Sequence, residues 1–189
     1  MTNLVKDGIH VVGIDDAPHS RAHDRTHIVF AFCEGLFLEN LVVRTIDVDG
    51  LNATKVISDT LDEHINYFQM VITHGITFGC FNLLDVVDLY DQIRKPIICV
   101  TENEPDQESF RSAIGNLDNV NLRTKIVKKA GELYNCTTGI GKNSVYYHLK
   151  GLSSGEADEV LKKFAVRSRL PEQVLLAHKI ATAFGDLEI

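Results

Sequence analysis

The chain of 189 residues is 44% hydrophobic and 24% charged, and its formal net charge is −7. This length supplies one substantial core but is short for two, so we expect residues 1–189 to form a single domain. It contains no run of about 20 apolar residues and no secretory signal pattern, which predicts a cytoplasmic protein without a membrane span. The negative charge argues against a constitutive, tight binder of duplex DNA.

The acidic excess lies in the first half of the chain. Residues 1–95 contain 14 of the 26 acidic residues and 7 of the 19 basic ones, so residues 96–189 contain 12 of each. Acidity concentrated in this way is expected around a cation site. Lysines of the neutral half could meet nucleic-acid phosphates if they lie on the same edge of the fold as that site. They are Lys125, Lys128, Lys129, Lys142 and Lys150.

The first half of the sequence predicts three meandering strands followed by alternating helices and strands. The apolar run of residues 9–14 is typical of a strand buried on both faces. β-Branched and aromatic residues then predict two antiparallel strands joined tightly at Glu34-Gly35. These and the next elements are expected at residues 26–33 and 37–48 (strands), 52–65 (helix), 68–72 (strand), 81–93 (helix) and 96–100 (strand).

The second half is predicted to add helices and two further strands. Helices are expected over residues 106–114 and 122–130, strands over 133–137 and 144–149, and closing helices from Ser153 or Ser154 to about 166 and from Pro171 to about 185. The order of the first seven elements is that of a ribonuclease-H-like α/β core. We therefore expect a mixed five-stranded sheet of order 3-2-1-4-5, with strand 2 alone antiparallel, helices on both faces and a C-terminal α+β extension.

Carboxylates follow the strands that end at one edge of this sheet. Strands one, three and four run the same way, so their carboxyl ends share the edge where open α/β sheets bind ligands. The residues there are Asp15, Asp16, Asp49 and His74, and Asp85 can reach the same place from the following helix. Converging carboxylates repel one another unless a cation neutralises them, and oxygen ligands suit Mg²⁺ or Mn²⁺. Such an ion could orient a phosphodiester and activate water.

Ordinary structural roles compete with this interpretation. A lone Asp after a strand is usually a turn or helix-cap residue, and Asp49-Gly50 is a common turn dipeptide. Asp15 and Asp16 are harder to explain in this way, because two adjacent carboxylates at the end of a buried strand are unfavourable without a partner. Neighbouring strand residues face opposite sides, so the sequence leaves open which of the two points into the cleft.

The segment from Gly75 to Asn82 is predicted to be the loop that contacts a substrate. Gly75 and Gly79 allow close approach of the backbone to a ligand. Phe78 and Phe81 could stack on an unpaired base, although aromatics in such loops more often fill the core. The loop lacks the lysine and hydroxyl residue of a P-loop, which argues against binding of a nucleoside triphosphate.

The other histidines and the cysteines are expected to be solvated or structural. His19, His23 and His27 stand with Asp24 at a flexible entry to a strand, where we expect solvated side chains and no metal cluster. The four cysteines have neither CxxC nor zinc-knuckle spacing and are expected to be buried, reduced thiols. They are Cys33, Cys80, Cys99 and Cys136.

Four motifs stand in order along the chain. They are Gly13 to Pro18 (GIDDAP), Asp49 to Thr54 (DGLNAT), Gly75 to Asn82 (GITFGCFN) with Asp85, and Pro171 to Ala183 (PEQVLLAHKIATA). Together they resemble the endonuclease dU family of archaea over nearly the whole chain. The resemblance implies a fold related to endonuclease V and an activity that nicks DNA near deaminated bases, notably deoxyuridine, with a divalent metal.

The resemblance also assigns positions. Asp15 or Asp16 corresponds to the first-strand carboxylate of endonuclease V, and His74 occupies the strand-four position where that relative has Asp. Several family members read Asp-Gly there, whereas this chain reads His74-Gly75. Histidine can bind a transition metal but adds no negative charge. The change therefore favours Mn²⁺, or calls for Asp49 or Asp85 as a further ligand, or abolishes cutting.

Two main hypotheses follow. The first is a divalent-metal-dependent endonuclease that nicks single-stranded or damaged DNA at or near deaminated bases, with the target base entering the Gly75 to Asn82 loop. Its catalytic residues would be Asp15, Asp16 and His74, and its ligands for Mg²⁺ or Mn²⁺ would be Asp15, Asp16, Asp49 and Asp85. The second is a nucleic-acid-binding or protein-binding module that keeps the fold without the nuclease, which His74 and the net charge favour. A small-molecule enzyme is a third, and a homodimer is left open.

Overall fold

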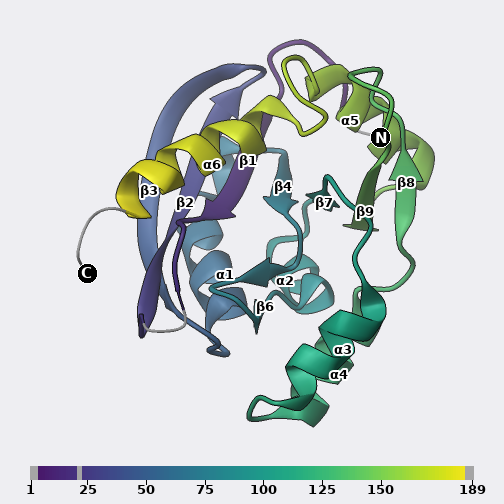
Figure 1. Cartoon of the computed structure of the whole chain (residues 1–189). Helices are drawn as coiled ribbons and strands as arrows, with labels where there is room; N and C mark the ends of the chain where they lie inside the picture. The colour runs from purple at the N-terminus through teal and green to yellow at the C-terminus, as the bar shows by residue number, and fades with distance from the viewer. Residues whose placement is uncertain (1–3, 21–22, 186–189) are drawn as a thin grey trace.

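The computed structural model describes residues 4–20 and 23–185 (Figure 1). Its strands are β1 (His10–Asp16), β2 (Arg25–Glu34), β3 (Phe37–Asp47), β4 (Met70–His74), β5 (Thr77–Phe78), β6 (Asn82–Leu83), β7 (Ile97–Thr101), β8 (Tyr134–Cys136) and β9 (Val145–Lys150). Its helices are α1 (Ala53–Glu63), α2 (Val86–Ile93), α3 (Gln107–Gly115), α4 (Val120–Lys129), α5 (Ser154–Phe164) and α6 (Glu172–Gly185), with a 3-10 turn over Ile65–Tyr67. No helix within the described ranges is both long enough and apolar enough to cross a bilayer.

Seven strands form one mixed sheet, in the order β3-β2-β1-β4-β7-β9-β8. β4 pairs in parallel with β1 and with β7, and β2 is antiparallel to both β1 and β3. The first five strands in space therefore have the predicted order 3-2-1-4-5 with an antiparallel second strand. The expectation of a five-stranded sheet was wrong, because β9 pairs antiparallel with β7 and carries β8 at its outer side. The predicted C-terminal strands thus extend the same sheet.

Two predicted boundaries also differ from the structure. The helix expected from residue 81 begins at Val86, because residues 77–83 form the antiparallel hairpin of β5 and β6. Asp85 then caps α2 by accepting a hydrogen bond from Asp88 N. The fourth strand begins at Met70 and not at residue 68, since the 3-10 turn reaches Tyr67.

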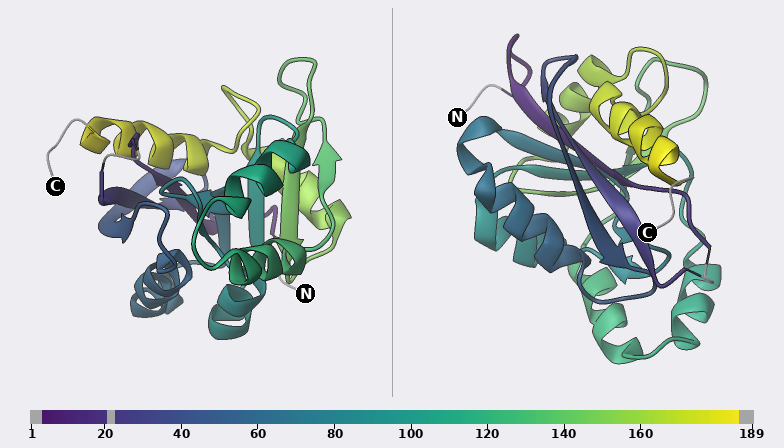
Figure 2. Two further views of the ribbon diagram at one scale, coloured as in Figure 1. Left: turned by 60° about the horizontal axis from the view of Figure 1, so that its bottom comes forward. Right: turned by 90° about the vertical axis from the view of Figure 1, so that its left-hand side faces the viewer.

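Helices cover both faces of the sheet, as predicted (Figure 2, left). On one face, Ile57 of α1 and Leu89 of α2 share a buried cluster with Ile14 of β1. On the other face, Val174 of α6 shares a cluster with Val11 of β1, and α5 packs beside it. β1 is therefore buried on both sides, which explains its continuous apolar run.

α6 lies very close to β1, and Gly13 permits the approach. A Cβ atom on Gly13 would lie 2.1 Å from the carbonyl oxygen of Gln173 and 2.7 Å from the amide nitrogen of Val174. Any side chain at this position would push the first turn of α6 away from the sheet. Because alternate strand residues face the same side, Gly13 and Asp15 both face α6. The close contact at Gly13 therefore fixes the position of the helix above Asp15.

Candidate functional site

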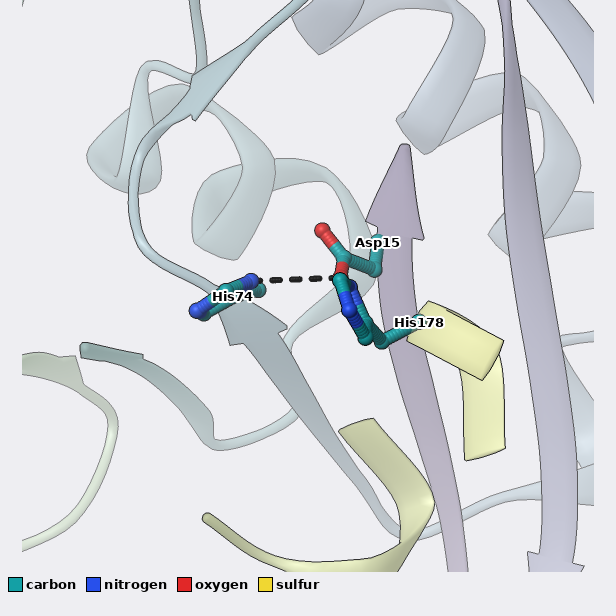
Figure 3. A group of neighbouring side chains, drawn as sticks. All are labelled: Asp15, His74 and His178. Carbon is teal, nitrogen blue, oxygen red and sulfur yellow. Dashed lines mark hydrogen bonds and ion pairs between the residues drawn. The ribbon is translucent and has the colours of Figure 1, made fainter. Parts of the chain in front are cut away.

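Two histidines converge on Asp15 at the carboxyl edge of the sheet (Figure 3). Asp15 lies near the end of β1 and is 3% exposed. His74 is the last residue of the neighbouring parallel strand β4, and its Nδ1 lies 3.1 Å from Asp15 Oδ2. His178 of α6 places its Nδ1 2.8 Å from the same oxygen. Three elements that are distant in the sequence thus meet at one carboxylate oxygen.

The position of His178 follows from the packing of α6. Val174 is buried against the sheet, and His178 stands one helical turn later on the same side of the helix. The side chain of His178 is 47% exposed and that of His74 is 30% exposed, whereas that of Asp15 is 5% exposed. The buried carboxylate of Asp15 therefore anchors this histidine group (Asp15, His74 and His178), and its two histidines are partly exposed to solvent.

Asp15 affects the pKa of His74 and the positions of the hydrogens on both histidines. Burial alone would lower the pKa of His74, but the hydrogen bond and charge of Asp15, with the charges of Glu102 and Asp16, raise it above its usual value. A carboxylate accepts hydrogen bonds and donates none. The Nδ1 atoms of His74 and His178 that face Asp15 Oδ2 therefore carry hydrogens in this arrangement.

These donors fit a transition metal better than Mg²⁺. Ligand atoms of Asp15, His74 and His178 all lie within 4.8 Å of one another. One carboxylate and two imidazoles suit ions such as Mn²⁺ or Zn²⁺, whereas Mg²⁺ prefers oxygen ligands. An ion held by the two Nδ1 atoms would require each hydrogen to move to Nε2 of the same ring, or to solvent from a protonated ring.

Asp16 faces the opposite side of β1. Its Oδ2 accepts a hydrogen bond of 2.9 Å from Gly79 N and lies 3.3 Å from His19 Nδ1. Burial and the repulsion of Asp15 raise the pKa of Asp16 to about 6, although the hydrogen bond from Gly79 acts in the other direction. Asp15 is thus the carboxylate that contacts His74 and His178, and Asp16 holds the loop that follows β5.

The structure does not bring the other two predicted metal ligands into this group. Asp49 lies in the turn after β3, where its Oδ1 accepts a hydrogen bond of 3.0 Å from Phe81 N. Asp85 caps α2 through Oδ1, and its Oδ2 lies 2.5 Å from Lys129 Nζ. Both carboxylates stabilise turns or helix ends, which is the ordinary role of Asp after a strand.

The predicted substrate loop is divided between a cavity wall and the core. Gly75 adopts the left-handed backbone conformation with φ +72° and lines a cavity. Phe78 is 1% exposed and belongs to the main core, as the structural alternative predicted. Phe81 is partly buried, and its ring packs edge-to-face on Phe110 at 5.4 Å between centroids. Gly79 is the donor to Asp16.

Asn82 ties the β5–β6 hairpin to the turn after β3. Its side chain is fully buried, and its Nδ2 donates to Asp47 O at 2.8 Å and to Asn52 Oδ1 at 2.7 Å. Its Oδ1 accepts a hydrogen bond of 2.8 Å from Ala53 N. Both hydrogens of the amide are therefore used within the protein, so the structure gives Asn82 a supporting position behind the loop.

A buried arginine fixes the same region from the other side. Arg123 of α4 is 2% exposed. Its guanidinium donates hydrogen bonds to the main-chain carbonyls of Asp49, Gly50, Phe81 and Asp118. The turn after β3, the hairpin and α4 are thereby held in one arrangement.

A cavity of about 620 Å³ begins at Gly75, the residue after His74. It extends between β7, β9, α3 and α4, and its walls include the rings of Phe110, Tyr146 and His148. Its polar lining includes Thr101, Asn103, Gln107, Arg111, Lys128 and Glu132. This volume lies within the range of roughly 300–1,000 Å³ that is typical of small-molecule pockets.

The lysines expected to meet phosphates are also divided. Lys128 lines the cavity, Lys125 lies on the same helix, and Lys129 is paired with the cap of α2. Lys142 lies in the loop before β9, whose first residues pair with the end of β7 at the carboxyl edge. Lys150 ends β9 opposite the start of β7, so it lies at the far edge of the sheet.

The expectation of solvated histidines at the entry to β2 holds for one of three. His23 is exposed, but His19 and His27 are partly buried. His27 packs edge-to-face on Phe184 of α6 at 5.5 Å between ring centroids. His19 lies between Asp16 and the hairpin loop. The expectation was wrong for these two, because His27 lies in β2 against Phe184 of α6 and His19 contacts Cys80 of the β5–β6 hairpin.

Comparison with known proteins places the chain in a family. The family described as endonuclease dU matches residues 7–185. The chain belongs to the endonuclease dU family. A UPF0215 protein of Methanopyrus kandleri is 36% identical over 181 residues, which cover 94% of this chain and 92% of that protein. A UPF0215 protein of Methanosarcina acetivorans is 33% identical over 187 residues, which cover 96% of this chain and 94% of that protein.

Solved structures confirm the relation in fold that the sequence resemblance implied. A protein of unknown function from Archaeoglobus fulgidus has a TM-score of 0.83 and 32% identity over 93% of this endonuclease dU chain and 98% of its own. Endonuclease V of Ciona intestinalis, in complex with DNA containing an inosine, has a TM-score of 0.60 and 11% identity over 92% and 84% of the two chains. This member of the endonuclease dU family therefore has an endonuclease-V-like fold.

Sequence reasoning missed His178, although this residue lies within the fourth motif. Its available signal was a histidine one turn after the apolar Val174, on the side of a helix that packs on the sheet. The partner, Asp15, is 163 residues away in the sequence. The close approach at Gly13 that brings them together becomes visible in the folded chain.

Proposed function

We propose that this protein is a divalent-metal-dependent endonuclease that nicks DNA at or near deaminated bases such as deoxyuridine. The observation that carries the proposal is the convergence of His74 and His178 on the buried carboxylate of Asp15, at the strand-end edge of an endonuclease-V-like sheet. Membership of the endonuclease dU family supports the same substrate class.

In this proposal Asp15, His74 and His178 hold the metal ion. When bound, the ion supplies positive charge that stabilises the phosphate and lowers the pKa of an attacking water. Two imidazole ligands favour Mn²⁺ over Mg²⁺. Asp15 contributes the single negative charge of the ligand set, and its burial keeps that charge in a fixed position.

Asp16 has a distinct role in the same proposal. Its hydrogen bond from Gly79 N fixes the loop beside the strand ends, and its negative charge lies next to Asp15. A cation bound at Asp15 would favour the charged form of Asp16. Asp16 thus contributes to cation binding through its charge and positions the substrate loop. The turns and the helix end near the substrate loop are stabilised by Asp49, Asp85 and Asn82.

The cavity next to His74 would receive the target base. Its volume of about 620 Å³ accommodates a nucleobase with its sugar, and the rings of Phe110 and Tyr146 offer faces for stacking. Burial lowers the pKa of His148, so its ring is neutral at pH 7 and donates Nδ1–H to Glu132 O at 3.0 Å. Unstacking a base costs less in single-stranded or damaged DNA, which favours those substrates.

The net charge of −7 limits affinity for undistorted duplex DNA. Lys128 lines the cavity, Lys125 lies on the same helix, and Lys142 lies in the loop before β9; in this proposal they provide the phosphate contacts. Lys150, at the far edge, does not take part. A protein with few phosphate contacts should bind DNA with a shallow dependence on salt.

The test is cleavage of end-labelled single-stranded and duplex oligonucleotides that carry one deoxyuridine, with Mn²⁺ or Mg²⁺. The wild-type protein is compared with Asp15→Asn and His178→Gln, and with Lys179→Gln as a control at the adjacent exposed residue of α6. We expect cutting with Mn²⁺ that both site variants lose by at least about 100-fold and the control retains. Absence of cutting of deoxyuridine, deoxyinosine and undamaged DNA with either metal would refute the proposal.

A non-catalytic nucleic-acid-binding module is the second candidate. The observation that favours it is histidine at position 74, which leaves Asp15 as the one carboxylate in the ligand group. Salt-dependent binding of the same oligonucleotides, without cutting under either metal, would establish this alternative.

A further inference from the structure

A second group of reactive side chains lies on the opposite side of β1 from the histidine group. Cys80 stands at the tip of the β5–β6 hairpin with the unusual left-handed φ of 64°. Its Sγ lies 3.2 Å from His19 Nε2. His19 Nδ1 in turn lies 2.8 Å from Ala17 O and 3.3 Å from Asp16 Oδ2. A thiol, an imidazole and a carboxylate thus follow one another in a line.

The hydrogen bonds define the direction of proton transfer within this line. The carbonyl of Ala17 accepts a hydrogen bond and cannot donate one, so His19 Nδ1 carries a hydrogen. In a neutral ring the lone pair is then on Nε2, the atom that faces Cys80 Sγ. After the thiol proton moves to Nε2, the imidazolium is stabilised by Ala17 O and Asp16 on one side and by the thiolate on the other. This is the arrangement of an activated nucleophile, its base and an orienting group.

The other three cysteines lack such an environment. Cys33, Cys99 and Cys136 are buried in the core, and burial raises the pKa of each thiol to about 12. These three thiols are buried, as the sequence predicted. Cys80 is partly exposed, so the prediction of a buried thiol was wrong at this position. The reactivity of Cys80 beside His19 can therefore be compared with that of the three core thiols in the same molecule.

We propose that Cys80 is a nucleophilic thiol, activated by His19, and a site of covalent modification by small electrophiles, with peroxides as the oxidising class. The proposal stands on the geometry of Cys80, His19 and Asp16 and is independent of the proposed nuclease activity. A cysteine reacts with electrophiles where its thiolate is stabilised and solvent can reach the sulfur.

The oxidation balances with a peroxide as co-reactant. The sulfur of Cys80 attacks one oxygen of hydrogen peroxide, so that an S–O bond forms and the O–O bond breaks. The sulfur is oxidised by two electrons to a sulfenic acid, and the peroxide is reduced by two. The thiol proton, held on His19 Nε2, passes to the leaving hydroxide and gives water.

Modification would act on the loop that Cys80 joins. The neighbouring amides of Gly79 and Phe81 donate hydrogen bonds to Asp16 and Asp49. An oxygen or an alkyl group added to Sγ needs space next to His19, and this displaces the hairpin tip from β1. Cys80 therefore connects the redox state of the protein to the geometry of the loop beside Gly75.

The test measures the rate of alkylation of each cysteine by iodoacetamide at pH 7, using mass spectrometry of the full-length protein without metal or DNA. A synthetic peptide of residues 77–83 is the unactivated reference. An ordinary thiol with pKa near 8.5 is about 3% thiolate at pH 7, and a thiolate of lower basicity is somewhat less nucleophilic, so activation should accelerate Cys80 about tenfold over the peptide. We expect the three core cysteines to react far more slowly than Cys80.

His19→Gln should bring the Cys80 rate to within about twofold of the peptide, whereas His23→Gln, an exposed histidine in the same segment, should leave it unchanged. Hydrogen peroxide followed by dimedone should label Cys80 in the wild type and not in His19→Gln. Circular dichroism verifies that the variants are folded. A wild-type Cys80 no faster than the peptide, or a folded His19→Gln variant as fast as wild type, would overturn the proposal. The first of these comparisons needs no variant.

Discussion

Replacing Gly13 by alanine tests whether the approach of α6 to β1 builds the histidine group. The new Cβ would lie 2.1 Å from Gln173 O, and real Cβ contacts remain above 3.0 Å, so the helix must move by at least about 0.9 Å. Overpacking of this kind costs about 1–3 kcal/mol, which lowers the melting temperature of a chain of this length by about 2–12 °C. Because His178 moves with the helix, the Mn²⁺ affinity expected under the proposed function should fall by about 10–100-fold.

The assay is thermal unfolding with and without Mn²⁺, since a ligand that binds the folded state raises the melting temperature by an amount that grows with the logarithm of its affinity. Gly155→Ala is the matched control: Gly155 lies in α5 and no atom lies within 4 Å of a Cβ added there. This control should keep the Mn²⁺ shift and gain up to about 1 kcal/mol of stability from the better helix former. A Gly13→Ala protein with the melting temperature and Mn²⁺ shift of the wild type would refute the reasoning.

Three further predictions concern charges. Asp16→Asn should raise the free energy of unfolding at pH 7 by roughly 1–3 kcal/mol, because the pKa of Asp16 rises on folding to about 6. This gain in stability should disappear below about pH 4, and an effect in urea titrations that does not change with pH would contradict the prediction. Arg123→Met should cost about 3–5 kcal/mol by leaving buried carbonyls unpaired, and a loss under 1 kcal/mol in the same titrations would exclude that role. Glu172→Gln should destabilise the protein at neutral pH, because the hydrogen bond with Arg167 lowers the pKa of Glu172. The difference in unfolding free energy from wild type should be complete above about pH 4.5 and shrink as the pH falls, and a difference that grows in acid would contradict the prediction.

The order of the sheet was predictable because each strand carries its own pattern. The apolar run before Asp15 and the β-branched strands around Glu34-Gly35 fix a meander, and short right-handed connections allow few arrangements after it. The β5–β6 hairpin was not predictable, because its apolar residues also fit the helix that follows. The positions of β8 and β9 in the sheet depend on the pairing of β9 with β7, which the local sequence pattern does not predict.

The candidate site was predictable in part, because the predicted strand order determines which strand ends lie next to each other. Asp15 and His74 end adjacent parallel strands, so topology brings them together once the sheet is known. His178 joins them through helix packing, which depends on the missing side chain of Gly13. Asp49 and Asp85 follow strand ends as well, but each meets a nearer backbone or lysine partner. Sequence patterns identify the edge where ligands gather but not which carboxylates remain available there.

The separation of Asp15 and His178 also has a consequence during synthesis. A ribosome adds about 5–20 residues per second, so roughly 8–30 s pass between the appearance of Asp15 and that of His178, 163 residues later. His74 appears 59 residues after Asp15, and from then until the end of this interval the nascent chain contains the carboxylate and one histidine of the group but not the second. A chain interrupted before α6 could form most of the sheet and still lack a complete ligand set. Under the proposed function, the metal site would be complete only in full-length molecules, and truncated chains would not cut nucleic acid.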